Sequence, residues 1–395
     1  MRSKNVQKTS ITITSLARLY GRAGAVLSLA PASIFVFEKE LTDWYYHDLV
    51  YINHPFATGK EKQPVSAIRV IAQRSLGTKK PVNEILISKD DRRAYVCSAY
   101  QVNAVFKLTF FSEYAYWDQL YIDPYNGKVL GKIDMRYDWI HLLRVIHQQL
   151  LLNYKAGHWL IAVASLIIFI SIITGVVLWF RKKKAAFKQR FTIKWRARWR
   201  RVNYDIHNLG GFYTHLLIFL LAATGLVWSF DWWANGIYRL LGDDPKTVFT
   251  HQQKVQAGNR HLNGDPLDAV CHDALTKRLN WTLLYIAMPG SGEEPDTDQF
   301  SVFLNFNDHG GWDESDNYGY NKHTGILVSQ NLMEHKTIGE KWRNSNYAIH
   351  TGSIYGLPNK ILASVTTMFC ALLPITGYLI WWGRRRKNNS TRKHS

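Results

Sequence analysis

Cysteine is scarce in this 395-residue sequence, which contains only three. The spacing of Cys97, Cys271 and Cys370 matches no metal-binding motif and provides no disulfide framework of the kind that stabilises small secreted domains. Cys97 and Cys271 fall in different segments, so a bridge between those segments is the one pairing that the sequence leaves open.

Acidic residues are also few, since 30 Asp and Glu stand against 49 Lys and Arg, a net charge of +19. Such a charge could attract nucleic acid, but the location of the basic residues decides which kind of partner they attract. Residues 181–201 carry eleven Lys or Arg and no acid, and 384–393 are similarly basic. Both runs abut long apolar stretches, so we interpret them as cytoplasmic flanks beside anionic lipid headgroups, with no nucleic-acid partner.

Charge is absent from the apolar stretches themselves. Three stretches contain no Asp, Glu, Lys or Arg, namely residues 159–180, 210–230 and 361–382. Each is about as long as the ~20 residues that cross a hydrocarbon core of ~30 Å. We therefore predict three transmembrane helices. The lack of an internal ion-coupling carboxylate argues against a transporter.

A shorter apolar stretch, residues 23–37, precedes them. A secretory signal peptide also fits this pattern. We favour a fourth span, because Arg18 and Arg22 can reach the interface and because four crossings place every basic cluster on one side of the membrane. Both termini are then cytoplasmic, and two large segments lie outside.

The external segments predict small antiparallel sheets. Aromatic and β-branched residues alternate with polar ones up to turns at Asp123–Gly127 and Lys322–Gly325, and a helix is expected near residues 64–74. The tyrosines and tryptophans in 111–121 and 312–320 could line a docking surface, but sheet core is the favoured interpretation. The fold class is thus an α-helical membrane protein with four transmembrane helices and two external α+β domains.

This organisation divides the chain into eight parts. They are the cytoplasmic N-terminus with an atypical first span (1–37), the first external domain (38–138), an interfacial helix with the second span (139–180), a basic linker (181–205), the third span (206–231), the second external domain (232–345), the fourth span (346–383) and a basic tail (384–395).

A Thr-Gly pair recurs in three spans, at Thr174-Gly175, Thr224-Gly225 and Thr376-Gly377, each followed by tryptophan. Small residues let helices approach closely, and tryptophans favour the membrane interface. We take these as the physical roles. The recurrence also indicates a duplicated unit, an external domain followed by a span with a basic cytoplasmic flank.

Five histidines lie within or beside the spans: His147, His158, His207, His215 and His350. A membrane-embedded histidine is costly without a partner, which makes it a functional candidate. The topology places His147, His158 and His350 near the outer side and His207 near the inner side. His215 lies about 12 Å from His207 along the helix and about 80° around it, so these two could not easily face one iron.

Haem explains imidazoles that face one another across a helical bundle, because its iron offers two axial positions and its body is flat and apolar. Two histidine ligands leave no position for dioxygen, which favours electron transfer. Interfacial histidines bonded to water or backbone, or a proton relay, remain the alternatives.

The order of several motifs resembles the PepSY-associated membrane proteins, some of which are iron-regulated, haem-containing reductases of ferric siderophores. The resemblance rests on YIDPYNGKVLG at 121–131, VIHQQLLLNYKAGHWLI, NYDIHNLGGFY, AIHTGSIYGLPNKIL and PITGYLIWWGRRR. It implies two external PepSY-like domains, a bacterial inner-membrane location with those domains in the periplasm, and haem b as cofactor, one or two per chain.

The resemblance implies haem ligation by His147, His207 and His350, with His158 and His215 as weaker matches. In this family a histidine usually precedes Leu-Tyr at the first span, but here Arg18 precedes Leu19, and Pro31-Ala32 stands where Thr-Gly is expected. The inner haem site is therefore either completed by His215 or altered.

The activity implied is reduction of an Fe(III) chelate, with a siderophore complex and its iron as substrate. The sequence has no glycine-rich dinucleotide motif, so the donor is a separate cytoplasmic reductase or a membrane quinol. The alternative is non-enzymatic: a PepSY-domain membrane protein that binds or regulates peptidases or envelope partners.

Overall fold

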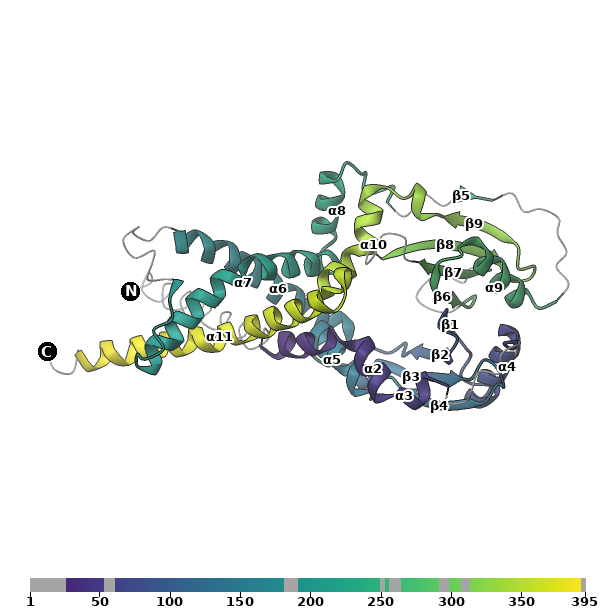
Figure 1. Cartoon of the computed structure of the whole chain (residues 1–395), viewed down its shortest axis with the longest axis horizontal. Coiled ribbons are helices and arrows are strands. Elements are labelled where there is room, and N and C mark those ends of the chain that lie inside the picture. Colours follow the sequence, from purple (N-terminus) through teal and green to yellow (C-terminus); the bar gives the residue numbers. More distant parts are fainter. Residues whose placement is uncertain are drawn as a thin grey trace.

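The computed structural model describes residues 26–52, 61–180, 191–248, 253–255, 264–290, 298–306 and 313–391. Long helices occupy one end of the elongated molecule and a β-sheet occupies the other (Figure 1). Arg18 and the start of the predicted first span lie outside the described residues.

Three described helices are long and apolar enough to cross a membrane. They are α6 (Tyr154–Phe180), α7 (Trp199–Ser229) and α11 (Leu357–Thr391). A shorter apolar helix covers Val26–Phe35, within the stretch predicted as an additional span. Because the preceding residues are not described, the fourth crossing stays a prediction.

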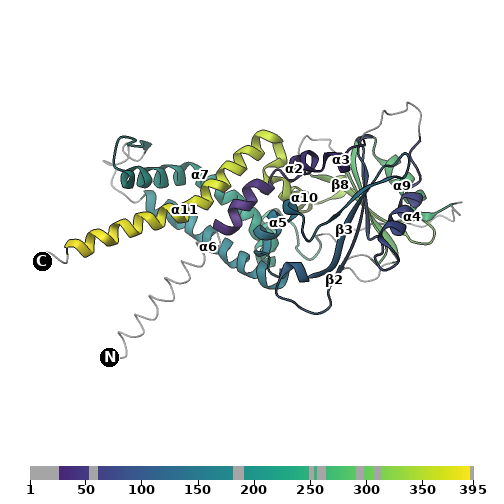
Figure 2. The ribbon, with the colours of Figure 1, turned by 90° about the horizontal axis from the view of Figure 1, so that it is seen from below.

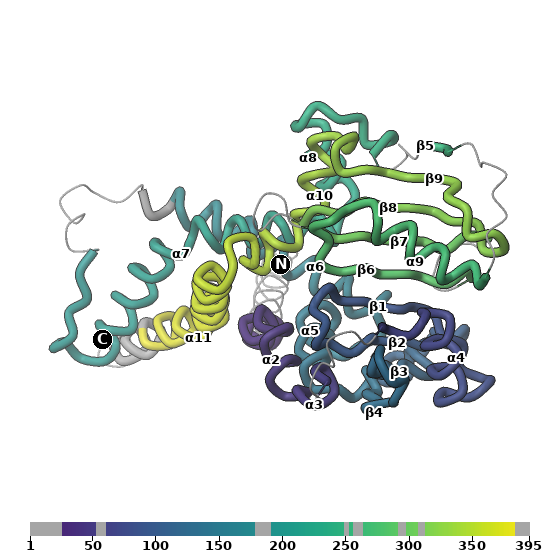
Figure 3. The backbone as a smooth tube through the Cα atoms, turned by 45° about the vertical axis from the view of Figure 1, so that its right-hand side comes forward, coloured from purple at the N-terminus to yellow at the C-terminus, as the bar shows by residue number. Residues whose placement is uncertain are grey.

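One continuous antiparallel sheet contains the strands of both segments that we predicted to be external. Its order is β4-β3-β2-β1-β6-β7-β8-β9-β5, and Figure 3 follows the strands from one edge to the other. The strands are β1 (Glu84–Ser88), β2 (Tyr95–Val102), β3 (Tyr114–Ile122), β4 (Val129–Asp134), β5 (Gln253–Lys254), β6 (Trp281–Ala287), β7 (Gln299–Phe306), β8 (Glu314–Asn321) and β9 (Leu327–Asn331).

The two halves meet where β1 pairs with β6, in a register that sets Ile85 opposite Ile286. The predicted turns are present, with Gly127 and Gly325 at the positive φ angles of 71° and 65° that glycine adopts without strain. The two predicted external domains therefore form one structural unit in which the second half extends the sheet of the first.

Helices α4 (Val65–Leu76) and α9 (Pro266–Lys277) cover the face of the sheet that points away from the spans (Figure 2). The Ser66 hydroxyl donates to Asp268 at 2.5 Å and joins the two helices. Cys97 and Cys271 are buried, with free thiols, in the core beneath them. The bridge that the sequence left open is therefore not formed.

Two helices link the sheet to the spans, and each begins with a side-chain cap. In α5 (Trp139–Gln149), the Asp138 carboxylate accepts from the His141 amide. In α10 (Ile338–Thr351), Thr337 and Glu340 form a capping box. Such caps fix where a helix begins, so both helices enter the membrane part in a defined register.

The remaining helices are short. They are α2 (Glu38–Tyr45), α3 (His47–Val50), α8 (Asp231–Leu240) and the 3₁₀ turns η1 (Phe110–Ser112), η4 (Met333–His335) and η5 (Ser353–Tyr355).

Candidate functional site

The structure brings together two of the five candidate histidines, His147 at the end of α5 and His350 at the end of α10. Their ring centroids are 6.1 Å apart and their planes are inclined by 31°. A metal ion bonded at about 2 Å to one nitrogen of each ring would separate the centroids by about 6 Å. The spacing therefore suits one metal ion shared by the two imidazoles.

A hydroxyl group faces the Nδ1 atom of each ring. Thr224 Oγ1 lies 3.0 Å from Nδ1 of His350 and donates its own hydrogen to the Leu220 carbonyl at 2.9 Å. Ser28 Oγ lies 3.0 Å from Nδ1 of His147 and donates to a main-chain carbonyl at 3.0 Å. Because each hydroxyl hydrogen is engaged, the oxygen accepts from Nδ1–H, which leaves the Nε2 lone pair for a metal ion.

A glycine makes room for the His350 ring. A Cβ atom added to Gly225 would lie 3.2 Å from Cε1 of His350, closer than ordinary van der Waals contact. Thr224 and Gly225 thus act together, since the threonine bonds the ring and the glycine lets it lie against α7.

The same arrangement holds His207 on α7. Thr376 Oγ1 lies 2.8 Å from Nδ1 of His207, and a Cβ on Gly377 would approach Cε1 of that ring to 3.3 Å. Two of the Thr-Gly pairs therefore position histidines, a role beyond the close helix packing that we expected from the sequence.

The third pair, Thr174-Gly175, holds no ring among the described residues. The Thr174 hydroxyl donates to carbonyls of its own helix, at Ile170 and Ser171. A Cβ on Gly175 would meet no described atom within 4 Å. At the first helix, the hydroxyl that faces a histidine comes from Ser28, three positions before the Pro31-Ala32 pair that we had aligned with Thr-Gly.

A cavity of about 510 Å³ surrounds His147 and His350, which we call the outer pair after the predicted topology. Apolar side chains from α6, α7 and the Val26–Phe35 helix line most of it, and both His147 and His350 lie in its wall. His158 also lines the cavity and stacks on Tyr154 with ring centroids 4.8 Å apart. Such a largely apolar space with two imidazoles in its wall fits an iron porphyrin.

The described residues contain no group of three or more His, Cys, Asp or Glu that could hold a bare metal ion. A pair of imidazoles suits a metal that brings four equatorial ligands with it, as haem iron does. The outer site therefore meets the requirements of haem.

The inner level is incomplete in the part of the chain that the structure describes. His207 has its threonine and glycine, but His215 does not complete a pair with it. The His215 ring bonds the Phe212 carbonyl of its own helix and lies 5.3 Å from the Phe212 ring. Completion of the inner site by His215 is therefore not supported by this arrangement.

Polar side chains also line the cavity. They come from Arg144 and Gln148 of α5 and from Arg343 and Asn344 of α10. Trp228 meets the His350 ring edge to face at 5.3 Å. Sequence reasoning identified the histidines but missed Ser28, Arg144 and Arg343. The i, i+3 spacing of Arg144 and His147 on one helix was the available signal.

The sequence matches the family described as PepSY-associated TM region over residues 32–384, which includes every residue of the outer site except Ser28 and Leu29. No curated protein gives a significant match.

Proposed function

We propose, given that the chain belongs to the family of the PepSY-associated TM region, that it is a haem-containing membrane electron-transfer protein. In this proposal it carries haem b between His147 and His350 and reduces Fe(III) chelates, such as ferric siderophores, outside the cytoplasm. The observation that carries the proposal is the 6.1 Å spacing of the two rings within an apolar cavity.

The residues around the pair have separate tasks. His147 and His350 would bind the iron through Nε2, while Ser28 and Thr224 hold the rings in the required tautomer. Trp228 and the apolar wall would exclude water and so favour rapid one-electron exchange over ligand binding. Haem, when bound, would supply a one-electron redox centre there.

The release of iron from the chelate follows from the chemistry of its two oxidation states. One electron converts Fe(III) to Fe(II), and hard oxygen ligands bind Fe(II) less tightly, so reduction releases the metal. The electron would come from a cytoplasmic reductase or from a membrane quinol.

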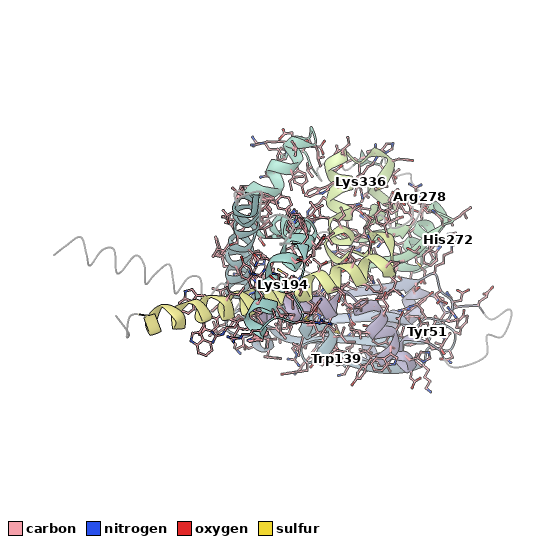
Figure 4. All side chains as sticks on the ribbon, turned by 60° about the vertical axis from the view of Figure 1, so that its left-hand side comes forward. Tyr51, Trp139, Lys194, His272, Arg278 and Lys336 are labelled. Atoms are coloured by element: carbon pink, nitrogen blue, oxygen red, sulfur yellow. The ribbon has the colours of Figure 1, made fainter. Side chains whose placement is uncertain are left out.

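The proposed topology places the sheet in the periplasm and both termini in the cytoplasm of a bacterial inner membrane, with Val26–Phe35 as part of a fourth span. It is supported by the positions of the basic segments. In Figure 4, Lys194 lies among the helices, whereas His272, Arg278 and Lys336 lie on the sheet part.

The test is an absorption spectrum of the purified protein, oxidised and then reduced, with haem quantified per chain. We expect sharp reduced α and Soret bands and one haem per chain, and we expect that His350→Ala abolishes them while the protein stays inserted. His272→Ala, which alters a histidine of the sheet part, is the control and should keep the spectrum. A colourless wild-type protein would overturn the proposal and leave the peptidase-binding alternative.

A further inference from the structure

Arg144 has a buried group without a partner. Its Nε atom is inaccessible to solvent and makes no hydrogen bond, while its Nη2 lies 3.2 Å from Nδ1 of the His141 ring. Leaving a charged donor buried and unpaired is costly. Arg144 also lines the cavity, so the charge of its guanidinium acts on whatever occupies the cavity.

Arg343 lies on the opposite wall. Its guanidinium carbon is 5.6 Å from the Trp228 ring centroid, and it also bonds the phenol of Tyr238. The stacking fixes the plane of the guanidinium beside the ring that contacts His350.

The charge of the two arginines is not balanced within the cavity wall. Among the described lining residues there are two arginines and no carboxylate. The carboxyl group of Glu38 is close enough to feel the Arg144 charge, but burial raises its pKa against that influence. The cavity is therefore electropositive at this end, and its occupant should carry anionic groups there.

Both arginines lie on the sheet side of the histidines. Arg144 precedes His147 by three residues of α5 and Arg343 precedes His350 by seven residues of α10, which corresponds to about 4.5 Å and about 10 Å along the helix axes. Arg144 contacts His141, whose ring packs edge to face on Trp117 of β3 at 4.8 Å. Helix α10 begins beside β8, where Lys336 bonds the Ser315 carbonyl, and reaches α7 at Asn346, so both cations lie at the end of the cavity nearest the sheet.

We propose that Arg144 and Arg343 bind the two propionate carboxylates of the haem, so that this edge of the porphyrin faces the sheet. The assignment rests on the function proposed above. Arginine pairs with carboxylates through two parallel hydrogen bonds, and two arginines match two propionates. The orientation places the vinyl edge among the apolar side chains and the propionate edge nearest an external electron acceptor.

The test compares protohaem with its dimethyl ester, in which both propionates are neutral. Full-length apoprotein in detergent is titrated with each porphyrin, and binding is followed by the Soret band. Wild type should favour protohaem, and Arg144→Met and Arg343→Met should each reduce that preference by about tenfold or more while leaving affinity for the ester unchanged. Lys341→Met, on α10 but outside the cavity wall, is the matched control.

The ester titration also reports whether each variant is folded, and Arg144→Lys and Arg343→Lys should keep part of the preference. If a substitution weakens the binding of both porphyrins equally, or leaves the preference for protohaem unchanged, the propionate assignment is wrong while the proposed function stands. An unchanged preference combined with a raised KM for an anionic Fe(III) chelate assigns the arginines to substrate instead. If wild type binds neither porphyrin, the proposed function fails and this assignment with it.

Discussion

Single hydroxyl groups decide which nitrogen each histidine of the outer pair offers. A neutral imidazole carries one hydrogen, and the partner of Nδ1 determines where it resides. Thr224 and Ser28 accept that hydrogen because their own hydrogens are given to carbonyl groups. Nε2 is thereby available before any metal arrives, which reduces the reorganisation that binding requires.

We expect Thr224→Val to weaken haem binding by about 10- to 100-fold, the usual effect of removing a partner that orients a ligand. Haem titration of the apoprotein measures the change, and the midpoint potential should shift with it. Thr174→Val is the control, because that hydroxyl donates to carbonyls of its own helix. Equal effects of the two substitutions would contradict the role of Thr224.

At this scale the sequence predicts the histidines but not their partners. A histidine in an apolar stretch is conspicuous because it is costly there. Ser28 and Thr224, in contrast, are ordinary residues of membrane helices, and they lie 119 and 126 positions from the rings that they contact. Only the folded arrangement distinguishes them from Thr174.

At the scale of helices, the closeness of the contacts determines how α7 packs against its neighbours. The α7 backbone at Gly225 lies against the His350 ring, and Gly210 of the same helix lies so close to Phe369 of α11 that a Cβ would overlap that ring. Glycines therefore set the distances from α7 to α10 and to α11. The sequence indicated such packing, but not that one of the contacts is with a candidate ligand.

Gly225→Ala should displace the His350 ring, because the new methyl group would lie 3.2 Å from Cε1. Overpacking of this kind costs about 1–3 kcal/mol, so we expect haem affinity to fall about 5- to 150-fold. Gly175→Ala, with open space at its Cβ, provides the matched comparison by Soret titration. Unchanged affinity in Gly225→Ala would show that α10 can move away at little cost.

For the whole molecule, the largest departure from the sequence analysis is the shared sheet. Alternating residues predicted the hairpins correctly, since turns such as Gly127 and Gly325 are local signals. The pairing of β1 with β6 joins residues about 200 positions apart, and no local pattern specifies it. Each half has one strand edge that the other covers, which prevents the edge-to-edge association to which open sheets are prone.

The orientation of the whole molecule can be tested with cysteines, because the three native thiols are buried. In intact spheroplasts, an impermeant maleimide should label Leu279→Cys, whose parent side chain is 90% exposed on the sheet part. Lys194→Cys should react only after the membrane is opened. The reverse pattern would place the sheet in the cytoplasm and remove the basis for an external acceptor.

The division of the outer pair between the two halves of the chain has a consequence for biogenesis. A ribosome that adds roughly 5–20 residues per second makes His350 roughly 10–40 s after His147. The pair does not exist until the last span is in place and the second half has joined the sheet. Haem would therefore be captured only by a finished chain, and a stalled or truncated product could not hold a half-ligated iron able to generate reactive oxygen at the membrane.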